Sequence, residues 1–252
     1  MTGTGAPFPT FPPGLWRRIM LQPGRGWIGG ALEDDMHCFH IRLDHDGKRI
    51  TKVSAAAVRT PWSACPGAAA FITSELTGEL LSEVATRDPT RHCTHLLDLA
   101  ILAAAHAHDS EPSAFDMRVA DRVEGRTTAT LEENGVERLR WQLQDTIIEG
   151  PERFAGRDIK RVAKWKHDFP PREAEWSTLL RRAIFISGAR VYEPPVGRPA
   201  ADMGPTRMGV CFNYQLPQAA ESMPVFERRE FSMSEHEPLD GFDPETVFNA
   251  TV

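Results

Sequence analysis

Cysteine is scarce in this sequence, which has four cysteines among its 252 residues. Domains that are stabilised by disulfides carry cysteine at a much higher density, so a disulfide framework is excluded as the basis of the fold. We therefore expect reduced thiols that serve as core residues, nucleophiles or metal ligands.

Long apolar runs are missing as well. The longest one, from Leu96 to Ala107, is too short to cross a bilayer and contains Asp98 and His106. The first residues are rich in proline and glycine and lack the charged start, apolar run and cleavage site of a signal peptide. These absences predict a cytoplasmic protein without a membrane partner.

An excess of basic charge is the third absence. The formal net charge is -6 and the isoelectric point is about 5.9, with lysine and arginine scattered along the chain. Such a chain has no field that attracts phosphate backbones, so nucleic acid is not an expected partner. The patterns G-x-G-x-x-G, P-loop, H-E-x-x-H and G-x-S-x-G do not occur. Nucleotide-binding, zincin and α/β-hydrolase functions therefore have no support.

The overall composition is that of a globular protein, with 41% hydrophobic and 25% charged residues. The length predicts a single α+β domain over residues 1–193, preceded by a proline-rich arm. Residues 194–252 are predicted to form an irregular, proline-rich strap. Because a solvated linker carries few aromatic residues, we expect this strap to pack on the body or on a partner.

An antiparallel hairpin sheet is predicted near the N-terminus. Apolar and polar residues alternate over 27–32 and 39–43, the period-two pattern of half-buried strands. Asp46-Gly47 suits a tight hairpin turn, after which 50–58 returns as the partner strand.

Two helices are predicted to pack on this sheet. The first begins near Ser63, a residue type that caps helices, has Pro66 in its first turn and ends at Gly78. The second runs from about Arg91 to His108 and has apolar residues at helical spacing.

The second half of the chain predicts another antiparallel meander. Alternating residues over 115–119, 128–131 and 139–143 are separated by turn residues that include Asn134-Gly135. A helix over 171–184 follows, because proline and acidic residues open it.

Several reactive side chains lie near predicted helix starts. Cys65 opens the first helix, and His92, Cys93 and His95 occupy the first turn of the second. Unpaired N–H groups and the helix dipole at such positions lower the pKa of a thiol. Asp35 precedes a strand, so we expect carboxylate, thiol and imidazole groups to converge on one end of the sheet.

Three interpretations of this cluster remain open. Asp35, Cys65, Cys93 and either His92 or His95 would form a four-ligand site for zinc or iron, although no C-x-x-C motif supports it. The same residues would also serve as a nucleophile or an acid/base pair. Alternatively, the cysteines are small buried hydrophobic residues and the histidines are polar residues near a helix start.

A second histidine–cysteine group, His37-Cys38-x-His40, resembles a metal-binding sequence. On a strand, His37 points to the face opposite Cys38 and His40, so at most two of the three side chains reach one metal ion.

Much of residues 15–190 resembles the bacterial family known as domain of unknown function 2889. The most specific part is Cys93-Thr94-His95-Leu96 followed by Asp98-Leu99. The rest of the resemblance comes from Arg17-Arg18-Ile19, Trp27 to Leu32, Asp35-Met36, Asp46-Gly47, Cys65-Pro66 and Gly78. The resemblance implies a role in the breakdown of aromatic compounds.

The chain also has a remote similarity to NifU-type iron-sulfur scaffold proteins, which implies a NifU-like core. Carried over residue by residue, the similarity selects Asp35, Cys65, His92 and Cys93. This sequence departs from the pattern just before Asp35, where the acidic pair Glu33-Asp34 replaces the first cysteine of the scaffold.

The absence of nucleotide motifs, the tryptophan-rich composition and the titratable residues at two helix starts lead us to expect an enzyme that needs no cofactor. With the aromatic compounds that the first resemblance implies, we expect a lyase that cleaves a side chain of a small plant- or lignin-derived aromatic compound by acid/base chemistry, with formaldehyde as a candidate product. Asp35, Cys65, His92, Cys93 and His95 are the predicted catalytic residues. One alternative is a zinc, iron or iron-sulfur protein that uses Asp35, Cys65, His92 and Cys93. A second is a non-enzymatic module whose tail docks a partner, and assembly as a homodimer stays open.

Overall fold

The computed structural model describes residues 11–191, 197–225 and 227–249. The chain forms two compact units, each built from separate stretches of sequence. The larger unit comprises Arg17–Phe115, Glu193–Arg229 and Pro238–Val252, and the smaller comprises Met1–Trp16, Asp116–Tyr192 and Glu230–Glu237. One boundary between the units, at 115/116, therefore falls inside the predicted single domain of residues 1–193. Another, at 192/193, falls close to the predicted start of the strap.

The larger unit contains an antiparallel sheet, whose strands lie in the order β4-β3-β2-β1, and the helices around it. Its elements are β2 (Trp27–Asp34), β3 (Cys38–His45), β4 (Ile50–Arg59), α1 (Gly67–Leu76), η1 (Leu81–Thr86), α2 (Thr94–Ala105), η5 (Ala200–Met203), η6 (Phe212–Tyr214), α5 (Gln218–Glu221) and α6 (Pro244–Asn249).

The smaller unit contains the strands β5 to β8 in sequential order, with helices that follow them in the chain. Its elements are β6 (Arg126–Glu133), β7 (Val136–Gln144), β8 (Ile147–Gly150), η2 (Glu152–Phe154), η3 (Ile159–Arg161), α3 (Val162–Trp165), η4 (Lys166–Asp168), α4 (Pro171–Ser187) and η7 (Phe231–Met233). The strands β1 (Gly14–Gly24) and β5 (Ser113–Ala120) each begin in one unit and end in the other.

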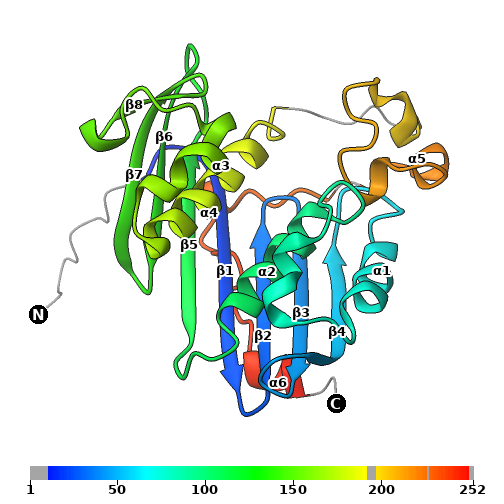
Figure 1. The fold of residues 1–252 in the computed structure, drawn as a ribbon. Coiled ribbons are helices and arrows are strands. Elements are labelled where there is room, and N and C mark those ends of the chain that lie inside the picture. The colour runs from blue at the N-terminus through cyan, green and yellow to red at the C-terminus, as the bar shows by residue number, and fades with distance from the viewer. Residues whose placement is uncertain (1–10, 192–196, 226, 250–252) are drawn as a thin grey trace, which may run out of the picture. The chain divides into compact units, whose positions relative to one another are not determined.

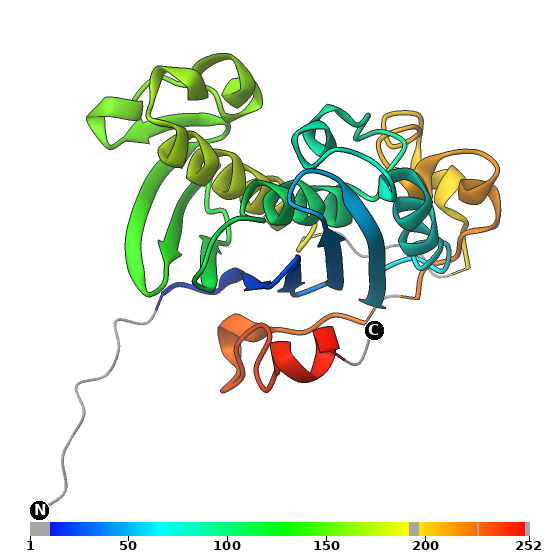
Figure 2. The ribbon, with the colours of Figure 1, turned by 60° about the horizontal axis from the view of Figure 1, so that its bottom comes forward.

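The two faces of the larger unit's sheet carry different elements, as alternate residues of β2 demonstrate. A Cβ atom at Gly30 would lie 3.0 Å from the side chain of Leu99 in α2, whereas one at Gly29 would lie 2.4 Å from the ring of Phe248 in α6. Figures 1 and 2 show the same arrangement, with α1 and α2 on one face and α6 on the other. Glycine at both positions allows this close approach.

The structure confirms an α+β fold with antiparallel strands. Both predicted strand groups and the helices near 66–76, 94–105 and 171–187 are present. The prediction missed β1, although its apolar residues alternate, because Arg17 occupies a buried position where the pattern expects an apolar side chain. It also missed the short strand β8.

The predicted cap of α1 was wrong. Pro66 stands at the capping position and no side chain caps the helix. The Ser63 hydroxyl instead accepts a hydrogen bond of 2.9 Å from the backbone N–H of Met223. This serine therefore anchors the C-terminal segment rather than the helix.

The described part of the segment 194–252 makes specific contacts with the body of the larger unit. Trp62 and Pro224 form an isolated β-bridge. The Leu239 N–H donates to a carboxylate oxygen of Glu33 at 2.7 Å, and the guanidinium of Arg42 donates to the Phe248 carbonyl at 2.6 Å. The segment thus satisfies polar groups of the body that would otherwise be buried without these partners.

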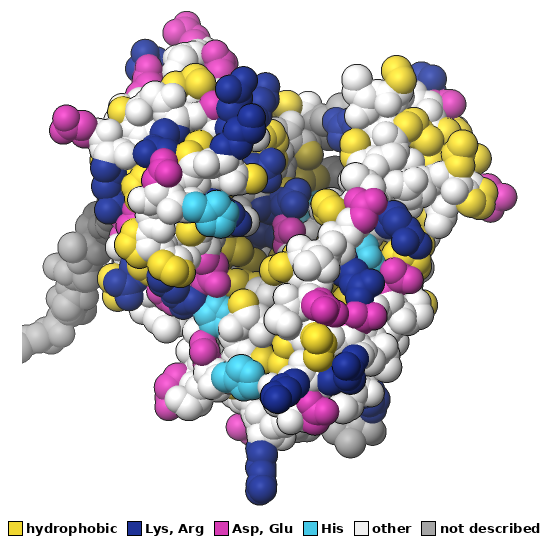
Figure 3. Space-filling model, in the orientation of Figure 1, with side chains coloured by type: hydrophobic (Ala, Val, Ile, Leu, Met, Phe, Trp, Pro, Cys, Tyr) yellow, Lys and Arg dark blue, Asp and Glu magenta, His cyan; other side chains and the backbone are white. Residues whose placement is uncertain are grey.

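Among the described residues, no helix is long and apolar enough to span a membrane. Basic and acidic side chains lie next to one another over much of the face shown in Figure 3. This mixing agrees with the scattered distribution of charge along the sequence.

We predict that Phe248→Ala destabilises the larger unit. Phe248 is 2% exposed and contacts the sheet face at Gly29, so its removal leaves a cavity that costs about 3–5 kcal/mol of unfolding free energy. Urea denaturation followed by circular dichroism measures the change. Val58→Ala, at a 59% exposed position on β4, serves as the control, and equal losses for the two variants would contradict the packing of α6 on β2.

Candidate acid/base site

The turn between β2 and β3 is built around the carboxylate of Asp34. One carboxylate oxygen, Oδ1, accepts hydrogen bonds from the backbone N–H groups of Met36 at 3.0 Å and His37 at 2.9 Å. The backbone N–H of Asp34 also donates to the carbonyl of His37 at 2.9 Å. Aspartate stabilises tight turns in this way, because its carboxylate accepts hydrogen bonds from backbone N–H groups two and three residues later in the chain.

The same carboxylate forms a buried ion pair. Arg17 lies directly opposite Asp34 in the register of β1 and β2, and its guanidinium donates to the second carboxylate oxygen, Oδ2. Both residues are almost fully buried. Burial by itself raises the pKa of Asp34, but the charge and hydrogen bond of His37 and the charge of Arg17 outweigh it and hold the pKa well below its usual value.

Glu33 and Arg59 fix the turn from the neighbouring positions. Arg59 donates to the carboxylate of Glu33 at 3.0 Å and to the backbone carbonyls of Asp34 at 2.5 Å and Asp35 at 2.7 Å. The carbonyl of Asp35 also accepts from the N–H of Arg229 at 2.8 Å. The backbone of the turn is therefore held by charge-assisted hydrogen bonds, which restrict its movement.

Two imidazole rings lie together above this turn. The Nδ1 atom of His37 is 2.9 Å from Oδ1 of Asp34, and since a carboxylate only accepts, Nδ1 carries the proton. His95, in the first turn of α2, stacks on His37 with the ring centroids 3.8 Å apart and the planes at 24°. Phe39 completes a set of three nearly parallel rings.

This arrangement suits proton transfer. With its Nδ1–H held by Asp34, His37 presents the lone pair of Nε2 as a base, and the carboxylate stabilises the imidazolium that forms. About a tenth of the His37 side chain, 11%, is exposed to solvent. The carboxylate, the oriented imidazole and the second ring therefore form an acid/base array.

Asp34, His37 and His95 also bring three possible metal-ligand atoms within 4.8 Å of one another. The geometry fits a metal ion poorly. Both carboxylate oxygens of Asp34 already accept hydrogen bonds, and the cation of Arg17 lies against one of them. The nearly parallel rings direct their nitrogen lone pairs along separate planes rather than toward one point.

The structure separates the predicted site residues into two neighbourhoods. His95 joins Asp34 and His37, whereas His92 packs on Phe71 with ring centroids 5.0 Å apart. Asp35 is buried in the β2–β3 turn. In the described part of the chain, the predicted metal set of Asp35, Cys65, His92 and Cys93 does not form a group at ligand spacing.

The thiols have pKa values opposite to the predicted direction. Burial raises the pKa of Cys93, the N-cap residue of α2, to about 12. Burial, together with the neighbouring thiols of Cys93 and Cys211, raises that of Cys65 well above its usual value. Desolvation of the thiolate thus outweighs the effect of the helix dipole on the pKa of both side chains.

Cys38 and His40 lie on one side of β3, as the alternation of a strand requires. The sulfur of Cys38 is 3.8 Å from Nε2 of His40, whereas the ring of His37 belongs to the Asp34 array. The structure thus places Cys38 and His40 together and His37 apart from them, whereas the prediction that at most two of the three reach one metal ion stays a prediction.

Sequence reasoning missed Asp34, His37 and Arg17 as a functional group. The available signal was an aspartate followed three residues later by histidine at a strand-to-strand turn, together with an arginine at an inward position of an alternating segment. The pairing of β1 with β2, which brings Arg17 to Asp34, has no local signature in the sequence.

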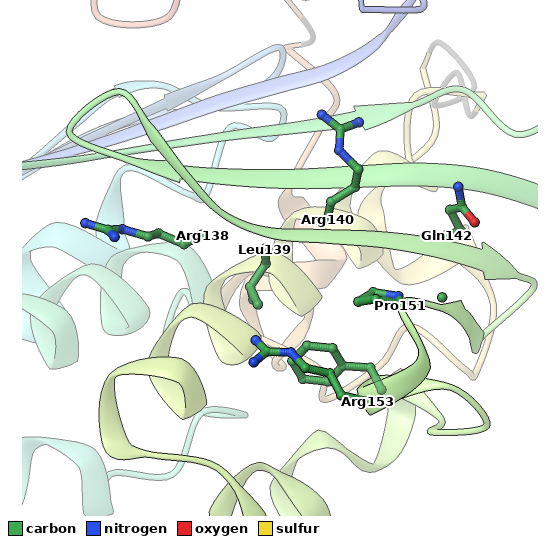
Figure 4. A pocket seen from close by; sticks show the side chains of 8 residues that line it. Arg138, Leu139, Arg140, Gln142, Pro151 and Arg153 are labelled. Carbon is green, nitrogen blue, oxygen red and sulfur yellow. The ribbon is translucent and has the colours of Figure 1, made fainter.

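Among the cavities that the described residues line, two lie away from this site. In the smaller unit, a cavity of about 340 Å³ is lined by Arg138 and Arg140 of β7 and by Pro151, Arg153 and Phe154, which follow β8 (Figure 4). Its three arginines pair with Glu133, Glu137 and Glu173 respectively, so their charge is compensated. In the larger unit, a cavity of about 520 Å³ lies beside Lys48, Leu81, Ile101 and His108. The lining of neither cavity includes His37 or His95.

No family model matches the chain, and no curated protein matches it.

We predict that Asp34→Asn lowers the unfolding free energy by about 3–5 kcal/mol at pH 7, because it removes one charge of a buried ion pair and leaves the other buried. The pKa of Asp34 is depressed in the folded state, so its contribution is fully present above the unfolded value of about 3.9 and is lost as the pH falls below it. Urea denaturation at pH 7, 5 and 3, as chosen test conditions, should therefore show the difference between variant and parent shrinking in acid.

Asp168→Asn is the matched control, because it removes an exposed partner of Arg157. Its cost should be about 1 kcal/mol or less. A cost for Asp34→Asn that is no larger than the control, or a difference that does not change with pH, would contradict the role of the buried pair.

Proposed function

We propose that the protein is an enzyme that uses the Asp34–His37 pair and His95 for acid/base chemistry. The observation that carries the proposal is the oriented imidazole: Nδ1 of His37 is bound to a buried carboxylate at 2.9 Å and a second imidazole stacks on the same ring. A structural histidine requires neither the buried counter-ion nor the second ring. This combination is typical of a base whose tautomer and direction are fixed.

His37 is the proposed base and His95 its neighbour. Two imidazolium cations at a centroid distance of 3.8 Å would repel each other, so the pair fits one base and one hydrogen-bond donor. Asp34 is the positioning residue, and Arg17 keeps its carboxylate ionised. Of the catalytic residues proposed from the sequence, His95 keeps an acid/base role in this proposal, and Asp35 follows Asp34 in the β2–β3 turn.

The proposed reaction is a lyase reaction without a cofactor on a small aromatic compound, a substrate class that rests on the resemblance to the domain of unknown function 2889 family. Nε2 of His37 removes the proton of a hydroxymethyl group. As the carbonyl of formaldehyde forms, the carbon–carbon bond breaks and its electron pair passes to the carbon attached to the aromatic system. His37 then returns the proton to that carbon, so the protons balance and no oxidant or reductant is consumed.

To test this proposal, the full chain is incubated with a panel of lignin-derived aromatic alcohols, and formaldehyde is measured together with the ultraviolet spectrum of the product. We expect turnover by the parent. His37→Gln should lower kcat/KM by about 10²–10⁴-fold, the usual contribution of a general base. His95→Gln should lower it less, because the Asp34–His37 bond persists.

His108→Gln is the control, because His108 lies after the other end of α2 and outside the array. Circular dichroism establishes that each variant is folded. Turnover that is unchanged in both His37→Gln and His95→Gln would rule out the assigned roles, and a parent that converts none of the panel would argue against the lyase assignment.

A further inference from the structure

The larger unit has a cavity of about 520 Å³ between the β3–β4 hairpin, η1 and the C-terminal part of α2. Gly47 and Lys48 of the hairpin, Leu81 of η1, and Ile101 and Ala105 of α2 are among the residues that line it. Sites that bind small molecules have volumes of about 300–1,000 Å³. The cavity is therefore large enough for a small organic ligand.

Two walls of the cavity are joined by hydrogen bonds. The N–H of Leu81 donates to the carbonyl of Lys48 at 2.9 Å, and Arg49 and Leu80 form an isolated β-bridge beside this bond. The guanidinium of Arg49 also donates to the carbonyl of Gly78. The hairpin and the segment of η1 are thus held together without a ligand, so the cavity is preformed, as most small-molecule sites are.

Most of the lining is aliphatic. The apolar side chains come from η1, the residue before it, and α2: Leu80, Leu81, Ala85, Ile101, Ala104 and Ala105. Leu81 and Ala104 are buried, whereas Ala85 and Ala105 are exposed, so this aliphatic surface is only partly covered by the residues that the structure describes. No phenyl, phenol or indole ring lines the cavity. A ligand with a hydrocarbon chain would cover this surface and remove it from water.

Lys48 gives the cavity a positive charge. No acidic residue is in the lining, and the Lys48 ammonium has no ion-pair partner among the described residues. The carboxylate of Asp46 accepts from the backbone N–H groups of Lys48 and Arg49 at 2.9 and 2.8 Å. Glu79, which lies before η1, pairs with Arg87. The charge of Lys48 is therefore available to an anionic group of a ligand.

The end of α2 determines where such an anionic group would lie. The carbonyl groups at a helix C-terminus carry partial negative charge, which disfavours an anion on that side of the cavity. The N–H of the C-cap residue His106 donates to carbonyls of the last turn and reduces this charge. Glu83 of η1 is exposed and is not in the lining. The anionic group is therefore favoured on the hairpin side, beside Lys48.

We propose that this cavity binds a small aliphatic monocarboxylate. The carboxylate lies beside the ammonium of Lys48, and the hydrocarbon chain packs against Leu81, Ile101 and Ala105 between η1 and α2. The single cation of the lysine matches the single negative charge, and the aliphatic lining matches the chain. The site goes beyond the proposed enzyme function, because its lining includes no residue of the acid/base array.

The test is a ligand-observed NMR titration of the full chain with hexanoate. We expect saturable binding at a single site. Hexanol has the same chain without the charge, and acetate has the charge without the chain. Each should bind about tenfold more weakly or worse, the scale expected when a hydrogen bond to a charged group or the burial of the chain is lost.

Two variants of the lining separate the two contributions. Lys48→Glu reverses the charge and should weaken the binding of hexanoate at least about tenfold while leaving that of hexanol unchanged. A variant that fails to fold would lose both ligands, so this pattern is specific to the charge. Ala105→Phe places a ring at an exposed position of the lining and should weaken the binding of both ligands.

Each variant has a matched control outside the cavity. Lys160→Glu changes an exposed lysine of η3, and Ala70→Phe changes an exposed alanine of α1, so both should bind hexanoate as the parent does. Circular dichroism establishes that all four variants are folded.

The proposal would be overturned by a parent that shows no saturable binding of hexanoate, or by hexanol or benzoate binding as tightly as hexanoate. Unchanged binding in folded Lys48→Glu or in folded Ala105→Phe would also overturn it. None of these measurements uses enzymatic turnover, so a failure of the lyase proposal leaves this test intact.

Discussion

The buried ion pair between Arg17 and Asp34 is the constraint on which the candidate site depends. Removing either charge from water is unfavourable unless the two meet, so their pairing is coupled to the register of β1 and β2. The same carboxylate closes the β2–β3 turn and binds His37. Strand pairing, turn conformation and the direction of one imidazole are therefore set by a single side chain.

Adjacent residues of β2 distribute these interactions over both faces of the sheet. Glu33 faces the C-terminal segment, where Arg229 and the Leu239 N–H bind its carboxylate. Asp34 faces the side of α2, which supplies His95. The alternation of a strand thus places two acidic residues in different surroundings. Glu33 binds the C-terminal segment, and Asp34 orients the ring of His37.

The start of α2 carries residues that belong to two different groups of side chains in the larger unit. His95 extends toward the β2–β3 turn, while His92 and Cys93 lie beside α1 and the segment that carries Cys211. His92 and His95 are three residues apart, a spacing that places two side chains on the same face of a helix. His92 precedes α2, so its ring is not held to the same face as that of His95. The result is an acid/base array and a thiol group at one helix start.

Residue periodicity and turn residues within short segments were enough to predict the antiparallel hairpins, the three longer helices and the shared side of Cys38 and His40. The sequence did not reveal β1, since the buried Arg17 interrupts its apolar pattern. It also predicted the wrong direction for the thiol pKa values, since burial outweighs the helix dipole. Which of the candidate residues meet depends on how distant segments pack in the folded chain. Asp34 joins Arg17 and His95, and Cys65 and Cys93 join Cys211, through contacts between segments that are distant in the chain and carry no local signature.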